Sequence, residues 1–364
     1  MIDALNLVNF KGFLDVTIPV GGVTLLSGLN NSGKSSVIQA LRMFCQSYEG
    51  ESPLLSGHGT VAELRARRAN PGSSVCIGVH RVRGDESAAL DELVLKADSH
   101  TRPVNAPLTC YVGADRLGPR IVLPIERSLG GMPRIGDKGE FVLDFLDRLG
   151  NALLPETMHH EKSEGNTLHY EIKGWLNEIA PGVLFHFSLD PKRDASHAEI
   201  DSFRPTNVGF GISYTLPILA ALLGMTAVAP RNGWGEDWGN HWESMKQARG
   251  VLLLLENPEA HLHPKGQTAL GALIVRAAAC GIQVVVESHS DHLMDGIRIA
   301  VKKGMIESRR VLFHFFERSA PDQCTFKTPQ LHADGKLDFW PEGFFDQTMK
   351  NRAVLASRRE PNGS

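Results

Sequence analysis

The sequence predicts an α/β fold with a mixed central sheet and helices on both of its faces. Near the N-terminus, a buried strand at residues 22–26 is followed by a glycine-rich loop and by a helix whose apolar face spans 37–45. Later in the chain, strands and helices alternate, which is typical of a mostly parallel sheet. The elements expected there are strands at 251–255, 282–286 and 310–316 and helices at 265–279 and 291–302.

Length and composition are those of a globular protein. The chain has 364 residues, of which 42% are hydrophobic and 22% charged, and its net charge is −3. This is ordinary for a globular protein of one large or two medium domains. Because the charge is near neutral, any contact with DNA must come from local patches. No apolar run reaches the roughly 20 residues of a membrane span, and the first residues do not resemble a signal peptide, so we expect a cytoplasmic protein without membrane contact.

The middle of the chain is less regular. Between 74 and 115 the pattern predicts antiparallel strands, and residues 140–186 read as helical around a polar loop. The five cysteines are scattered and form no CxxC pair, so we expect neither a zinc site nor a disulfide framework. No internal repeat and no heptad run was found, so we expect no long coiled-coil arm.

The glycine-rich loop carries the strongest chemical signal. Residues 28–35 read Gly-Leu-Asn-Asn-Ser-Gly-Lys-Ser, which fits GxxxxGK[ST] in full between a strand and a helix. The glycines let backbone N–H groups turn toward an anion, and the helix N-terminus adds partial positive charge. Lys34 can reach the β- and γ-phosphates of ATP, and the Ser35 hydroxyl can ligate Mg²⁺. The residues expected to contact the nucleotide here are Gly28, Asn30, Asn31, Ser32, Gly33, Lys34, Ser35 and Ser36.

A carboxylate is expected at the tip of a central strand. The continuous apolar run 251–255 suits a strand that is covered on both faces, and Glu256 follows it directly. Ligands of open α/β sheets bind at the carboxyl ends of the strands. We therefore expect Glu256 to hold Mg²⁺ together with Ser35, through water. The alternative is a surface carboxylate on a strand-to-helix turn.

A histidine is expected at the tip of the neighbouring strand. The run 283–286 leads into Glu287 and then His289, which follows Glu256 by 33 residues. A histidine in this place can donate a hydrogen bond to the γ-phosphate and so report its presence.

Four sequence blocks together resemble the RecF/SMC-like branch of the ABC ATPases, and in particular the OLD-like bacterial ATPases. They are Asn9-Phe10-Lys11, the loop 28–36, the block Glu-Asn-Pro-Glu-Ala-His-Leu-His-Pro at 256–264, and Glu-Ser-His-Ser at 287–290. Residues 207–214 and 339–346 also resemble this family, whereas residues 45–200 add little to the resemblance. The resemblance implies one ABC-type head over 1–364. Its expected parts are a nucleotide-binding core (1–48 and 250–320), an antiparallel β region (73–125), a helical and signature region (140–225) and a C-terminal tail (321–364).

The resemblance also implies a homodimer, or a higher oligomer, with ATP between two heads. A signature segment of one head would complete the site of the other, and by position Asn207, Gly209 and Gly211 are the candidates. The segment is not the Leu-Ser-Gly-Gly-Gln of transporters, and Pro217 would kink a helix that spans it. The alternative is a turn that precedes a core helix.

One position departs from the superfamily pattern. The magnesium-binding acid is normally followed by a glutamate that polarises the attacking water, but Asn257 stands there and cannot accept a proton at neutral pH. Hydrolysis would then be slow, or Glu259 or Glu287 would serve as the base. We favour slow turnover assisted by one of these two acids.

The resemblance implies a function. OLD-like relatives such as the Septu-type anti-phage ATPases work with a nuclease partner, so we expect an ATP-driven switch subunit that controls a separate effector, a nuclease. No C-terminal nuclease domain is expected in this chain, since Asp334 and Asp338 read as a hairpin turn. The alternative is a RecF-like DNA repair clamp. If the chain is instead the switch subunit, we expect it to contact nucleic acid through its complex with the effector. Arg116 and Arg120 follow a strand and could contact a nucleotide or the partner head, or equally form a buried ion pair. Trp234, Trp238 and Trp242 recur every four residues, either as a helix edge that seeks a partner surface or as packing under the insert.

Overall fold

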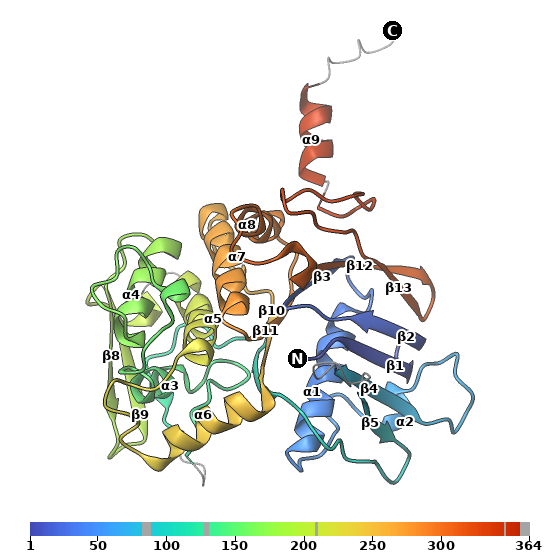
Figure 1. The fold of residues 1–364 in the computed structure, drawn as a ribbon, viewed down its shortest axis with the longest axis horizontal. Coiled ribbons are helices and arrows are strands. Elements are labelled where there is room, and N and C mark those ends of the chain that lie inside the picture. Colours follow the sequence, from blue (N-terminus) through green and yellow to red (C-terminus); the bar gives the residue numbers. More distant parts are fainter. Residues whose placement is uncertain (82–88, 127–130, 208–209, 346, 357–364) are drawn as a thin grey trace.

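The computed structural model describes residues 1–81, 89–126, 131–207, 210–345 and 347–356. Figure 1 shows the central strands flanked on one side by the N-terminal strands and on the other by a lobe of helices and short strands. No helix in these described ranges is both long enough and apolar enough to span a bilayer.

The central sheet confirms the predicted α/β fold. In the part of the chain that the structure describes, it has six strands in the order β13-β12-β3-β11-β10-β6. Neighbouring strands are parallel, except that β13 is antiparallel to β12. The bounds are β3 Val23–Gly28, β6 Leu108–Val112, β10 Val251–Glu256, β11 Gln283–Glu287, β12 Val311–Ala320 and β13 Gln323–Lys327.

Two boundaries of the predicted organisation are wrong at this sheet. Strand β6 was expected in the antiparallel region 73–125, but it pairs in parallel with β10. It lies at the sheet edge and is only half-buried, so it lacks the continuous apolar run that marks the inner strands. Strand β13 was expected in a C-terminal tail over 321–364, but it forms the opposite edge of the same sheet.

Alternate residues of the inner strands pack into two separate cores. Leu253 and Val284 belong to the core that contains the helices beside the sheet, among them α7 (Pro264–Ala279) and α8 (Asp291–Lys302). Leu252 and Val285 belong to the core formed with α1 (Lys34–Tyr48) and the N-terminal strands. Because both faces of β10 are covered, its sequence is apolar without alternation, as expected for a central parallel strand.

Two smaller sheets flank the central one. The N-terminal sheet is antiparallel in the order β2-β1-β4-β5, with β1 Ala4–Phe10, β2 Phe13–Pro19, β4 Val75–Arg81 and β5 Ala89–Leu95. The other has the order β7-β9-β8, with β7 Leu123–Pro124, β8 Phe185–Asp190 and β9 Ala195–Ile200. Strands β8 and β9 correct the prediction of a helical region over 140–225. The alternation of Phe185, Phe187 and Leu189 has the period of a strand and was the available signal.

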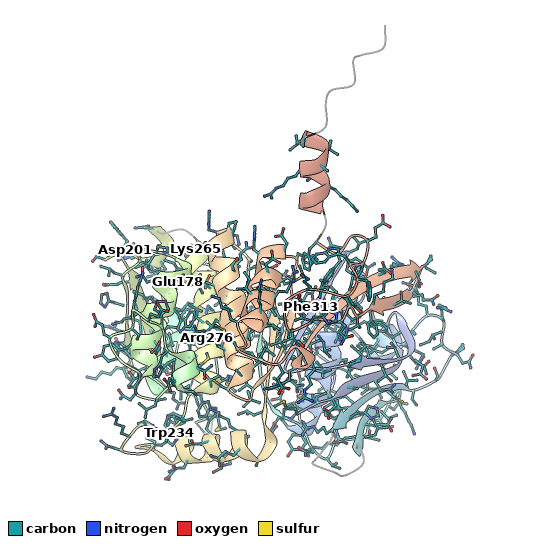
Figure 2. The ribbon with its side chains drawn as sticks, turned by 45° about the horizontal axis from the view of Figure 1, so that its top comes forward. Glu178, Asp201, Trp234, Lys265, Arg276 and Phe313 are labelled. Atoms are coloured by element: carbon teal, nitrogen blue, oxygen red, sulfur yellow. The ribbon has the colours of Figure 1, made fainter. Side chains whose placement is uncertain are left out.

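Helices complete both sides of the sheet. Lys265, in α7, lies 3.7 Å from Glu178 in α4, and Figure 2 shows the two side by side. Trp242 of α6 is buried against Trp234, which favours packing over a free partner surface for these tryptophans. The bounds are α1 Lys34–Tyr48, α2 Val61–Leu64, α3 Val142–Arg148, α4 Leu168–Ile179, α5 Phe210–Thr226, α6 Asp237–Arg249, α7 Pro264–Ala279, α8 Asp291–Lys302 and α9 Gln347–Ala356, with short 3₁₀ turns at Glu156–Met158, Pro205–Asn207 and Ser308–Arg310.

Helices α7 and α8 meet at two glycines. A Cβ atom on Gly271 would lie 2.2 Å from the carbonyl oxygen of Leu293, and one on Gly296 would lie 2.2 Å from that of Thr268. Both obstacles are backbone atoms, which cannot rotate away. The close approach of these helices therefore depends on the missing side chains.

We expect Gly271→Ala to destabilise the protein by about 1–3 kcal/mol or more, because the added methyl group overpacks a backbone contact. Thermal unfolding measures the effect. Gly235→Ala is the control, because nothing lies within 4 Å of a Cβ atom at that loop position. Equal melting temperatures for the two variants would contradict the close packing of α7 and α8.

Candidate nucleotide-binding site

The tips of three parallel strands bring the predicted site residues to one edge of the sheet. Glu256 at the end of β10 pairs in register with Glu287 at the end of β11. Glu287 in turn pairs with Leu26 of β3, two residues before the glycine-rich loop. The parallel register alone therefore places two carboxylates beside residues 28–35.

The loop has the backbone of an anion cradle. Gly28 and Gly33 have φ values of +133° and +105°, and Asn31 has a φ of +61°. A Cβ atom on Gly28 would lie 2.1 Å from the carbonyl oxygen of Phe316, so only glycine fits there. Gly33 is also the N-cap of α1 and has no side chain to cap the helix. The first N–H groups of α1 are thus left for an anion.

Lys34, Ser35 and Glu287 form the floor of the site. The Ser35 hydroxyl donates a 2.9 Å hydrogen bond to Glu287, and the Lys34 ammonium lies 3.8 Å from the same carboxylate. Lys34 also donates to the carbonyl oxygens of Gly28 (3.0 Å) and Leu29 (2.8 Å). A triphosphate would therefore replace contacts that the lysine makes with its own loop.

Burial dominates the electrostatics of this floor. Burial raises the pKa of Glu287, and the hydrogen bond from Ser35 and the charge of Lys34 oppose that rise. Burial likewise lowers the pKa of Lys34, against the attraction of Glu287. Both ions lie in a place that water solvates poorly, which is where a bound phosphate or metal gains most from them.

A cleft of about 580 Å³ opens above this floor. Its size is within the range of small-molecule sites. Segments that are far apart in the sequence form its walls, and several of the side chains are cationic. The lining residues include Lys11, Asn30, Asn31, Ser32, Gly33, Lys34, Ser35, Ser36, Gln39, Arg65, Arg67, Glu287, Arg318, Asp322 and Cys324.

Arg116 fixes the turn that follows Glu256. This side chain is 2% exposed, and its guanidinium donates 2.7 Å hydrogen bonds to the carbonyl oxygens of Gly113, Glu256 and Asn257. The arginine therefore fixes the backbone of this turn through its carbonyl oxygens. Neither of the two roles left open for it, contact with a nucleotide or an ion pair, describes these bonds.

Asn257 has a φ of +44° in the same turn, and its N–H donates a 2.8 Å hydrogen bond to the carbonyl oxygen of Glu287. Asparagine adopts this left-handed conformation more readily than glutamate does. Asn257, which stands where the superfamily has its catalytic glutamate, therefore also suits the left-handed backbone of this turn.

Glu259 and His289 are joined to each other. The backbone N–H of His289 donates a 2.9 Å hydrogen bond to Glu259, and burial raises the pKa of that carboxyl group. Burial, followed by the nearby charge of Lys34, lowers the pKa of His289. The exposed histidine ring is thus within electrostatic reach of the lysine that would hold the phosphates.

The candidate signature residues do not join this cleft. Asn207 is exposed at the end of a 3₁₀ turn, and Gly211 lies in the first turn of α5, where a Cβ atom would be 3.2 Å from the carbonyl oxygen of His261. Neither is among the residues that line the cleft. Gly209 lies outside the described residues. The helix α5 continues through Pro217.

The residues present fit a magnesium ion that arrives with a nucleotide. In the described ranges, no three His, Cys, Asp or Glu side chains form a ready-made metal site. Mg²⁺ in nucleotide sites takes most of its ligands from phosphates and water, with one or two from the protein. Ser35 and Glu287 converge within 2.9 Å, with Glu256 on the adjacent strand, which suits such an ion.

The comparisons with known proteins agree with this class of site. Residues 1–96 match a family model described as "AAA ATPase domain", and residues 117–295 match one described as "AAA domain, putative AbiEii toxin, Type IV TA system". Residues 306–355 match a model described as "Protein of unknown function (DUF3696)". No curated protein sequence matches the chain.

Solved structures show the fold. An Smc head domain with an extended coiled coil, from Pyrococcus furiosus, aligns over 98% of this chain and 99% of its own with a TM-score of 0.51 at 13% identity. The SMC head of Thermotoga maritima aligns over 90% and 98% (TM-score 0.43, 13% identity). A RecF structure aligns over 90% of this chain and 98% of its own (TM-score 0.43, 12% identity).

The fold and the site together define an ATP-binding P-loop ATPase. Its mixed α/β fold is similar to that of an Smc head domain, and residues 1–96 and 117–295 match models described as AAA domains.

Sequence reasoning named Arg116 from its position after a strand end but left its role open. It missed the hairpin of β12 and β13, whose Arg318, Asp322 and Cys324 line the cleft. No local pattern connects that hairpin with the loop at 28–35.

We expect Arg116→Lys to lower both stability and ATP hydrolysis, because one ammonium cannot replace the planar guanidinium on three carbonyl oxygens. The loss of buried hydrogen bonds should cost about 1–3 kcal/mol in thermal or chemical unfolding. The exposed neighbour Arg120→Lys is the matched control. If both variants unfold alike, Arg116 does not hold the turn.

Proposed function

We propose that the chain is the ATP-dependent switch subunit of a bacterial anti-phage defence complex. In this proposal two heads close on ATP, slow hydrolysis sets the lifetime of the closed state, and that state controls a separate effector, a nuclease. The observation that carries the ATP-dependent part is the set of Lys34, Ser35 and Glu287 at the floor of the cleft.

The defence role is supported by two resemblances. The family model that matches 117–295 names a toxin of a type IV toxin–antitoxin system in its description. The sequence blocks at 256–264 and 287–290 resemble OLD-like ATPases, some of which work with a nuclease.

Closure of two heads is supported by the position of the signature candidates. Asn207 and Gly211 lie outside the cleft of their own head, and Asn207 is exposed. The free N–H groups at the start of α5 suit a γ-phosphate of a second head.

Slow turnover is supported by Asn257. An amide cannot accept the proton of the attacking water. Either a carboxylate elsewhere in the site accepts it, or the proton passes to bulk water and hydrolysis is slow. Glu287 contacts Ser35 directly, whereas Glu259 is bonded to the backbone of His289. We therefore assign assistance to Glu287 and positioning of the histidine to Glu259.

We expect Lys34→Ala to abolish magnesium-dependent ATP binding, because the ammonium lies against the backbone of the phosphate cradle. Isothermal titration of the full chain measures this. Lys336→Ala, at an exposed turn, should bind ATP like the wild type. Wild-type affinity in Lys34→Ala would remove the basis of the proposed function.

We expect Asn257→Glu to speed single-turnover hydrolysis by about tenfold or more, since a positioned general base typically contributes 10²–10⁴-fold. Glu287→Gln should slow hydrolysis. Because glutamate is strained at a φ of +44°, the folded state of Asn257→Glu must first be verified by its melting temperature. An unchanged rate in a folded Asn257→Glu variant would mean that water is not activated at that position.

The second candidate function is a RecF-like DNA clamp. The fold shared with an SMC head favours it. Duplex binding whose affinity falls steeply with salt would favour the clamp over the switch.

A further inference from the structure

The hairpin of β12 and β13 forms part of the mouth of the ATP cleft, through Arg318 in β12, Asp322 in the turn and Cys324 in β13. The N–H of Cys324 donates a 3.0 Å hydrogen bond to the carbonyl oxygen of Gly12. A Cβ atom on Gly12 would lie 2.4 Å from the Cys324 sulfur, and one on Gly33 would lie 3.1 Å from it. The hairpin therefore packs directly against the phosphate-binding loop.

A second segment reaches the same mouth from the other side of Gly12. Lys11 donates its N–H to the carbonyl oxygen of Leu64, and Ala66 donates to that of Asn9. These bonds hold residues 64–67 beside the turn that joins β1 to β2.

Asp322 connects the two segments. Its carboxylate lies 3.6 Å from the guanidinium of Arg67 and 3.8 Å from that of Arg318. The Arg67 side chain is 83% exposed, so this ion pair contributes little to stability and is easily rearranged by a ligand. All three side chains line the cleft.

The chemistry of a carboxylate decides which end of a nucleotide it can face. A triphosphate at neutral pH presents acceptor oxygens and negative charge, which repel an aspartate. A nucleoside presents hydrogen-bond donors, namely ribose hydroxyls and base amino groups, which a carboxylate accepts. A guanidinium stacks on the flat face of a base.

From this geometry we infer that Arg67, Arg318 and Asp322 form the subsite for the nucleoside end of the nucleotide. The inference rests on the proposed ATP binding and deepens it. Asp322 accepts hydrogen bonds from the nucleoside, Arg67 or Arg318 covers the base, and Lys34 holds the phosphates. A segment matched by a family model without assigned function thereby gains a role in nucleotide recognition.

The test separates the two ends of the ligand. Full-length protein is titrated with ATP and with inorganic tripolyphosphate in magnesium buffer. Asp322→Asn suits the turn, because asparagine tolerates the φ of +60° at that position. We expect Asp322→Asn to weaken ATP about tenfold, the order expected for loss of a charged acceptor. It should leave tripolyphosphate binding unchanged or tighter. Asp334→Asn, at another exposed turn, should change neither.

Arg67→Gln provides an independent arm, and it should also weaken ATP while sparing tripolyphosphate. If the variants weaken both ligands equally, or neither, the subsite assignment is wrong even though ATP binding stands. If the wild type binds neither ligand, the proposed function itself fails. Titration with 2′,3′-dideoxy-ATP then locates the donors. Loss of the difference between wild type and Asp322→Asn assigns them to the ribose, and its persistence assigns them to the base.

Discussion

The in-register parallel pairing of β3, β11 and β10 is the constraint on which the site depends. It brings Glu256 and Glu287 level with each other at the edge where the phosphate-binding loop begins. Two carboxylates placed together repel, and burial adds to the cost. Ser35 and Lys34 offset this cost at Glu287. The floor of the cleft is therefore held ready for a divalent cation, which would relieve the repulsion, and for an anion, which would satisfy the lysine.

The turn after β10 illustrates how backbone geometry and chemistry meet in one residue. Arg116 holds its carbonyl oxygens, and Asn257 adopts a left-handed conformation within it. An asparagine at this point relaxes the backbone and removes a carboxylate at the same time. In the proposed function, slow hydrolysis and a well-defined turn would both result from this one residue, and a switch whose closed state acts as a signal would gain from both.

Local sequence patterns predicted the parts of this molecule whose structure is locally determined. The loop at 28–35, the buried strand before it, and the strand and helix order after 250 all depend on residues close in sequence. The partner of β6, the position of β13 and the contact of Cys324 with Gly12 depend on pairings between distant segments, which no local pattern encodes. The hairpin at 185–200 was different, because its alternation was visible in the sequence. Its apolar residues were assigned instead to the preceding helical pattern.

The cleft draws its walls from residues 11–39, from 63–67, and from the β11 tip and the β12–β13 hairpin, which come after most of the chain. A polypeptide leaving the ribosome carries the phosphate-binding loop early but lacks the strands beside it until residue 324 has emerged. ATP can stabilise only a chain that has reached that point, because a ligand shifts folding only through the state that binds it. Cellular ATP would therefore stabilise the folded state of completed heads but not that of nascent or truncated ones.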